Sequence, residues 1–124
     1  LVVVTGVQTC ALPIYGDYFR WRDLWPKIAA VFGMPAAGPE PLALAGFMAD
    51  KAPLWDAMVK KHALKPYRFG EVVAWPFGDY VFNCNWDVMT SVTKSRQHGF
   101  HEVVDSEEMF VRLLERFRAE RIVP

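Results

Sequence analysis

Apolar side chains recur at helical spacing near the start of the chain. The five residues that carry this pattern are Trp21, Leu24, Trp25, Ile28 and Phe32. Their spacing places them on one face of an α-helix whose opposite face is polar. Gly33 can take the positive φ that a helix C-terminus favours, and Pro35 cannot continue a helix. The pattern therefore predicts a helix that begins near Arg22 and ends at Gly33.

The same kind of pattern predicts two more long helices. The first covers residues 52–62, where Pro53 is tolerated in the first turn. Its expected common face consists of Leu54, Trp55, Met58, Val59 and His62. The second covers residues 105–121, and Asp105 followed three residues later by Glu108 has the form of a capping box. Its expected apolar stripe consists of Phe110, Leu113, Leu114 and Phe117.

Shorter elements are predicted between these helices. Residues 34–41 are rich in proline and glycine and predict a loop. Residues 70–82 predict two short helical pieces, because Pro76 and Gly78 interrupt a helical period, and we place the joint at Trp75–Pro76. Residues 91–99 predict a short helix that Ser91 caps and Gly99 ends, after which Phe100 packs onto the core.

The kinked aromatic run at residues 75–80 is the strongest candidate for chemistry. A rigid joint would point Trp75, Phe77 and Tyr80 in different directions, as the wall of an apolar pocket requires. The alternative is a helix that only packs against the core. The run itself does not decide between the two.

Composition narrows the choice of partner. The 124 residues include 14 basic and 14 acidic side chains, so no basic field favours nucleic acid. No apolar run reaches the roughly 18 residues of a membrane span. Five Trp and nine Phe are many for this length, and such rings need a partner surface. Composition therefore favours neither nucleic acid nor a membrane as the partner.

Metal and disulfide chemistry find little support in the sequence. Outside residues 1–14 the chain has one cysteine, Cys84, so residues 15–124 can form neither an internal disulfide nor a cysteine-based metal site. His98 and His101 have no carboxylate at ligand spacing. We therefore expect no metal.

Three segments resemble a known family. Residues 16–33 read Gly-Asp-x-Phe-x-Trp-x-x-x-Trp-Pro-x-Ile-Ala-x-x-Phe-Gly, residues 91–100 contain Lys-Ser followed by Gly-Phe, and residues 121–124 read Arg-Ile-Val-Pro. Together they resemble the C-terminal substrate-binding part of the progesterone 5-beta-reductase/iridoid synthase-like group of extended short-chain dehydrogenase/reductases. The resemblance covers residues 16–124.

The resemblance implies both a fold and an activity. The chain would be a mainly α fragment, the C-terminal helical substrate-binding part of an α/β Rossmann-type enzyme. The parent would be a cytoplasmic NADPH-dependent reductase acting on enone-like C=C or C=O groups. Phe77 would contact the substrate, with Trp75 and Tyr80 beside it. A nucleotide-sugar epimerase or dehydratase and a freestanding helical binding module are the alternatives.

The sequence also lacks what such a reductase needs for catalysis. No glycine-rich turn with phosphate-binding spacing is present, and no tyrosine is followed by lysine at the fourth position. We therefore expect no catalytic residue, no cofactor-binding residue and no activity in this chain.

Residues 1–14 resemble the translation of a common sequencing adapter, and we interpret them as an artefact to be excluded from fold reasoning. The protein proper would then be residues 15–124, a truncated reductase region. The alternative is a natural β-strand over residues 1–5 followed by a glycine turn.

Overall fold

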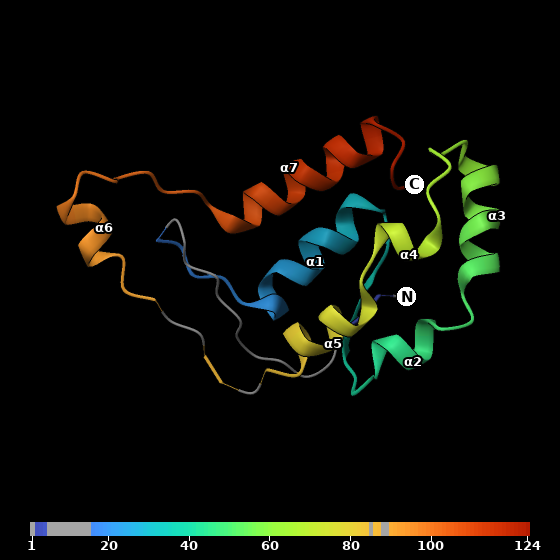
Figure 1. Cartoon of the computed structure of the whole chain (residues 1–124), viewed down its shortest axis with the longest axis horizontal. Coiled ribbons are helices and arrows are strands. Elements are labelled where there is room, and N and C mark those ends of the chain that lie inside the picture. The colour runs from blue at the N-terminus through green and yellow to red at the C-terminus, as the bar shows by residue number, and fades with distance from the viewer. Residues whose placement is uncertain (1, 5–15, 85, 88–89) are drawn as a thin grey trace.

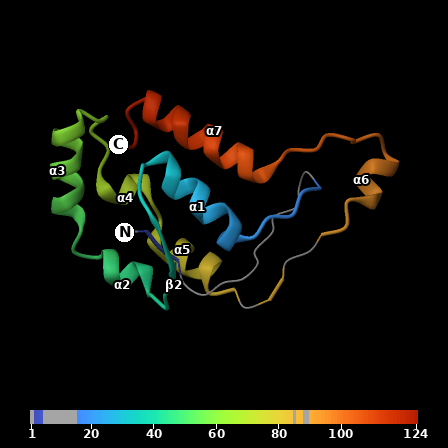
Figure 2. The same cartoon turned by 180° about the vertical axis from the view of Figure 1, so that it is seen from behind.

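The computed structural model describes residues 2–4, 16–84, 86–87 and 90–124, and these are mainly helical, as predicted (Figure 1). The helices are α1 (Trp21–Val31), α2 (Leu44–Met48), α3 (Ala52–His62), α4 (Phe69–Val72), α5 (Trp75–Phe82), α6 (Thr93–Gln97) and α7 (Ser106–Ala119). Two short strands, β1 (Val2–Val4) and β2 (Ala36–Pro39), pair in parallel. The molecule is elongated, with α3 at one end and α6 at the other (Figure 2).

Helix α1 confirms the first prediction within one residue at its start. Gly33 has φ of 63°, and the Met34 N–H donates to Ala29 O at 2.9 Å, which closes the helix C-terminus. Leu24 is fully buried and Ala29 is 1% exposed. The polar face is exposed, so the hydrophobic pattern placed this helix correctly.

A cluster of aromatic rings joins α1 to α5 and α7. The Trp21 ring lies 4.9 Å from Phe82 of α5 and 5.8 Å from Phe110 of α7, measured between ring centroids. Phe19, which precedes α1 and is 8% exposed, lies 5.1 Å from Trp21 and 5.7 Å from Phe110. All four contacts are edge-on, the geometry that aromatic quadrupoles favour. This ring cluster therefore links the three helices to one another.

Two carboxylates hold the start of α7. Asp105 accepts the Glu108 N–H at 2.8 Å, which confirms the predicted N-terminal cap. Asp17 accepts the Ser106 N–H at 2.7 Å from a position 89 residues earlier in the chain. The Ser106 backbone hydrogen bond is the main cause of a lowered pKa for Asp17. Asp17 therefore ties the segment before α1 to the last helix.

Three details of the predicted elements are wrong. The joint between α4 and α5 lies at Val73–Ala74, before Trp75, because Pro76 sits in the first turn of α5, where its missing N–H costs no hydrogen bond. Residues 36–39 are a strand, because backbone pairing with β1 outweighs the low strand propensity of glycine and proline. Phe100 is 43% exposed, so its ring is only partly covered where full packing onto the core was predicted.

Both predicted apolar faces on the long helices are narrower than expected. On α3, Trp55 is buried, whereas Leu54 is 59% exposed and His62 is exposed. On α7, Leu113 is 37% exposed. The described residues cover only part of each apolar face, and periodicity does not report how wide the covering surface is.

The interpretation of residues 1–14 stays a prediction. Residues 5–14 lie outside the described residues, as does Tyr15. Val2–Val4 lie in a strand, as the alternative interpretation predicted for residues 1–5. In the part of the chain that the structure describes, no helix is both long and apolar enough to cross a membrane.

Among the leucines in the helices, replacing Leu24 should lower the free energy of unfolding the most. Leu24→Ala leaves a cavity at a fully buried position and should lower the free energy of unfolding by about 3 kcal/mol. Leu54→Ala, at an exposed position on α3, should cost under about 1 kcal/mol. Urea denaturation measures both values, and equal losses would contradict the placement of the core.

Because of Asp17, the free energy of unfolding should decrease as the pH falls. Its pKa in the folded chain lies below the ordinary value of 3.8, so its charged form stabilises the fold above that pH. This stabilisation is lost as the pH falls through the lowered pKa. Asp17→Asn should therefore unfold more easily at neutral pH and lose less stability on acidification. Urea denaturation at about pH 7 and about pH 3 tests this, with Asp56→Asn on the exposed face of α3 expected to behave as wild type.

Candidate functional site on helix α5

Helix α5 presents two aromatic rings to solvent. Phe77 is 63% exposed and Tyr80 is 73% exposed. They are three residues apart, which puts them on the same side of a helix. Their ring centroids lie 6.3 Å apart with planes 30° from parallel, so they are stacked. The structure therefore brings together two of the three aromatic residues proposed from the sequence.

The third residue, Trp75, lies apart from this pair. Its ring lies 5.7 Å from that of Phe69 on α4. The indole nitrogen is buried, and it has no hydrogen-bond acceptor among the residues that the structure describes. Trp75 therefore packs on α4 and is not part of the stacked pair.

Asp79 has a role that the sequence reasoning did not assign to it. Its two carboxylate oxygens accept the first two backbone N–H groups of α2, from Leu44 at 2.6 Å and from Ala45 at 2.9 Å. Carboxylates bind such N–H groups strongly at the positive end of a helix. A sequence signal did exist, because residues 41–43 offer α2 no Ser, Thr, Asp or Asn as a cap.

Gly78 lets α2 approach α5 closely. A β-carbon at this position would lie 3.2 Å from Leu44 Cδ1, closer than side-chain atoms normally approach. The glycine and Asp79 therefore act at the same contact between α5 and the start of α2. The sequence analysis treated Gly78 only as a helix breaker, whereas it lies inside α5.

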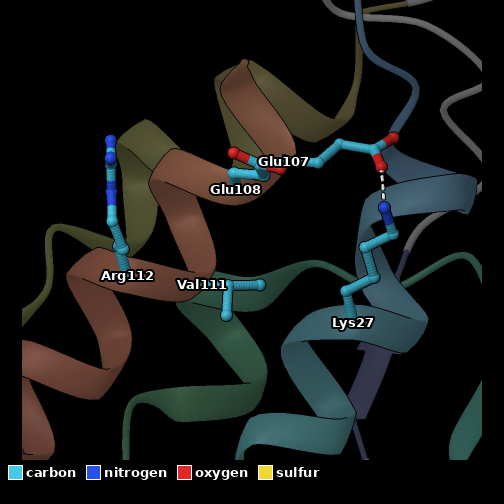
Figure 3. A pocket seen from close by; sticks show the side chains of 5 residues that line it. All are labelled: Lys27, Glu107, Glu108, Val111 and Arg112. Atoms are coloured by element: carbon cyan, nitrogen blue, oxygen red, sulfur yellow. Dashed lines mark hydrogen bonds and ion pairs between the residues drawn. The ribbon is translucent and has the colours of Figure 1, made fainter. Parts of the chain in front are cut away.

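A separate shallow cavity of about 280 Å³ lies between α1 and α7. Its lining residues are Lys27, Glu107, Glu108, Val111 and Arg112. Lys27 and Glu107 form an ion pair across it (Figure 3), and the hydrogen bond to Glu107 is the main cause of a raised pKa for Lys27. The cavity contains none of the aromatic residues of α5. Its ion pair links two helices and leaves no nucleophile facing the space.

The described residues do not form a metal centre. No group of three or more His, Cys, Asp or Glu side chains in that part of the chain is placed to hold a metal ion. His98 Nδ1 lies 2.8 Å from Lys94 O, so that ring nitrogen already contacts a backbone carbonyl of α6. Cys84 is a half-buried free thiol, as expected.

Comparison with known proteins places these helices in a family. Residues 17–124 match the model of the PRISE-like Rossmann-fold domain. The chain belongs to this family. The match confirms the resemblance to the progesterone 5-beta-reductase/iridoid synthase-like group that residues 16–33 and 91–100 indicated.

Curated relatives of this PRISE-like chain include plant and fungal enzymes. It is 35% identical to (S)-8-oxocitronellyl enol synthase of Catharanthus roseus and 33% identical to that of Antirrhinum majus, in each case over 88% of this chain. It is 30% identical to the short chain dehydrogenase gsfE of Penicillium aethiopicum over 99% of this chain. The chain spans 29% of the length of both plant relatives and 38% of the fungal one.

Replacing a ring of the exposed pair and replacing the packed tryptophan should change the free energy of unfolding by different amounts. Phe77→Ala should change the free energy of unfolding by under about 1 kcal/mol, because most of the ring is already in water. Trp75→Ala should lower it by about 2–3 kcal/mol, because the ring packs on Phe69. Thermal or urea unfolding provides both values. A large loss for Phe77→Ala would mean that its ring belongs to the core.

Proposed function

We propose that this PRISE-like chain is the C-terminal substrate-binding part of a NAD(P)H-dependent reductase. The parent enzyme would reduce an enone-like C=C or C=O group. The observation that carries the proposal is the stacked, exposed pair of Phe77 and Tyr80 on a helix of the matched family domain. A ring pair of this kind is costly to leave in water and is suited to an apolar ligand.

The chemistry of the pair supports a substrate with an apolar body. Phe77 offers one flat apolar ring, and Tyr80 adds a phenol that can donate or accept a hydrogen bond. Together the rings would bury the hydrocarbon part of a substrate and exclude water from one side. Trp75, packed on Phe69, would support the backbone of α5 from below. These roles belong to binding and orientation and need no catalytic group from this chain.

A nicotinamide cofactor does not fit the residues of this chain. The sequence contains neither the glycine-rich turn that holds a pyrophosphate nor a tyrosine with lysine at the fourth position after it. We therefore propose that the cofactor, NADPH in our proposal, binds to a part of the parent enzyme that this chain does not include. The share of the relatives that the chain spans supports this division.

A cytoplasmic location completes the proposal. Outside residues 1–14 the single cysteine, Cys84, leaves no disulfide framework to suggest an oxidising compartment. We propose a small-molecule substrate as the partner and assign no catalytic residue to this chain.

The proposal predicts what lies upstream in the gene. Sequencing the source DNA upstream of the Gly16 codon should reveal, in frame, a glycine-rich βα turn followed by a Tyr-x-x-x-Lys motif. The complete protein should oxidise NADPH only when an enone is present, and the 124-residue chain by itself should not. Phe77→Ala in the complete protein should raise KM by about tenfold, the effect of losing one well-packed ring contact.

A control and two contrary results make this test decisive. Phe100→Ala removes an exposed ring of the same type from outside α5 and should leave KM unchanged. Turnover of a nucleotide sugar in place of an enone would support the epimerase or dehydratase alternative. An intact natural start before residues 1–14 would favour a freestanding binding module.

A further inference from the structure

Helix α5 has two sides with different tasks. At about 100° per residue, Gly78, Asp79 and Phe82 fall on one side of the helix and Phe77 and Tyr80 on the opposite side. The first side is the one that contacts the rest of the molecule. Phe82 lies against Trp21 and Trp25, with ring centroids 4.9 and 6.0 Å apart, and Asp79 holds the start of α2. The direction of the exposed rings therefore depends on how the inner side is fixed.

The two fixed points on the inner side resist different movements. The Phe82 ring anchors the C-terminal end of α5 in the ring cluster through its contacts with Trp21 and Trp25. Asp79 lies about one turn earlier and makes two hydrogen bonds to consecutive N–H groups of α2. A carboxylate that uses both oxygens in this way has one preferred orientation. Asp79 therefore opposes rotation of this eight-residue helix relative to the start of α2.

The start of α2 is a suitable anchor for this purpose. Both hydrogen bonds reach across 34 or more residues of sequence, so they join separate parts of the fold. The close approach of Leu44 to Gly78 leaves little space for α5 to turn against α2. In addition, the residue at the N-cap position of α2, Ala43, makes no side-chain hydrogen bond. Asp79 supplies that cap, and α2 in turn holds Asp79.

We infer that Asp79 is a positioning residue. It fixes the direction of the Phe77–Tyr80 pair by holding α5 against the N-terminus of α2. The inference rests on the proposed function where it states that these rings contact the substrate. It differs from a simple stabilising role, because a cap that only stabilised α2 would leave the direction of the rings unchanged when it was removed.

The test compares Asp79→Asn with wild type in the 124-residue chain. Asparagine has almost the same shape, but it replaces one acceptor oxygen by an NH₂ group that faces a backbone N–H. Hydrogen exchange at the Leu44 and Ala45 amides should become about tenfold faster, as expected for the loss of one charge-assisted hydrogen bond. The nuclear Overhauser contacts between the Phe77 and Tyr80 rings should weaken or shift.

Binding of an enone measures the consequence for the site. Benzylideneacetone, an enone with an aromatic ring, serves as the probe and is titrated against both proteins by NMR. Asp79→Asn should raise its Kd about fivefold, and Asp79→Glu, which keeps two acceptor oxygens on a longer arm, should recover part of the affinity. Asp56→Asn, which removes a carboxylate from the exposed face of α3, is the matched control and should change neither exchange nor affinity.

The outcomes separate the inference from the proposed function. Unchanged ring contacts in Asp79→Asn would overturn the positioning role, even if α2 exchanged faster. Unchanged probe affinity despite altered ring contacts would also overturn it. Failure of wild type to bind the probe, or full affinity in Phe77→Ala, would contradict the proposed substrate contact and with it the substrate part of this inference. If Asp79→Asn does not fold, Asp79→Glu is compared with wild type: shifted ring contacts with weaker probe binding would support the positioning role, and unchanged ring contacts and affinity would overturn it.

Discussion

The ring of Trp21 is the contact on which the arrangement of this chain depends. It touches Phe19 before α1, Phe82 on α5 and Phe110 on α7, so segments from three distant parts of the sequence meet at one side chain. Large aromatic rings bury much apolar surface per residue, which matters in a chain with short helices and little sheet. The exposed face of α5 is held in place from this centre.

Short helices create a second constraint, because their first backbone N–H groups need hydrogen-bond acceptors. Carboxylates supply these acceptors. Each helix leaves its first N–H groups without partners, and in a helix of five residues these groups are most of the backbone donors. Asp79, from a distant part of the sequence, supplies acceptors at the start of the five-residue α2, and Asp17 does the same at the start of the longer α7. A cap from an adjacent residue and a cap from a distant residue therefore have different effects on the structure. Asp105 closes its own helix, whereas Asp17 and Asp79 also fasten one segment to another.

Sequence reasoning identified the long elements because their signals are local. The apolar period of α1, the proline at the start of α3 and the Asp105 cap of α7 can each be read within about a dozen residues. It failed where the cause lies far away in sequence. The strand at residues 36–39 exists through pairing with β1, and nothing within that segment indicates it. The exposure of Phe100 and Leu113 likewise depends on what covers them.

The candidate site shows the same difference between features with a local sequence signal and features set by distant contacts. The aromatic run on α5 was visible from its composition, and the three-residue spacing of Phe77 and Tyr80 accounts for their stacking. The separate position of Trp75 was not visible, because the joint before α5 was placed two residues too late. The role of Asp79 required knowledge of a contact with residue 44. Family resemblance pointed to the segment, and only the three-dimensional contacts gave each side chain its place.

The hydrogen bond between Asp17 and Ser106 has a consequence for the growing chain on the ribosome. Its partners are 89 residues apart, and Phe110 lies still further along. At about 5–20 residues per second, synthesis leaves Phe19 and Trp21 without their α7 partners for roughly 4–18 seconds. During that interval the nascent polypeptide displays the rings that later form its centre. Its yield in a cell will therefore depend on translation speed and on chaperones that shield early aromatic residues.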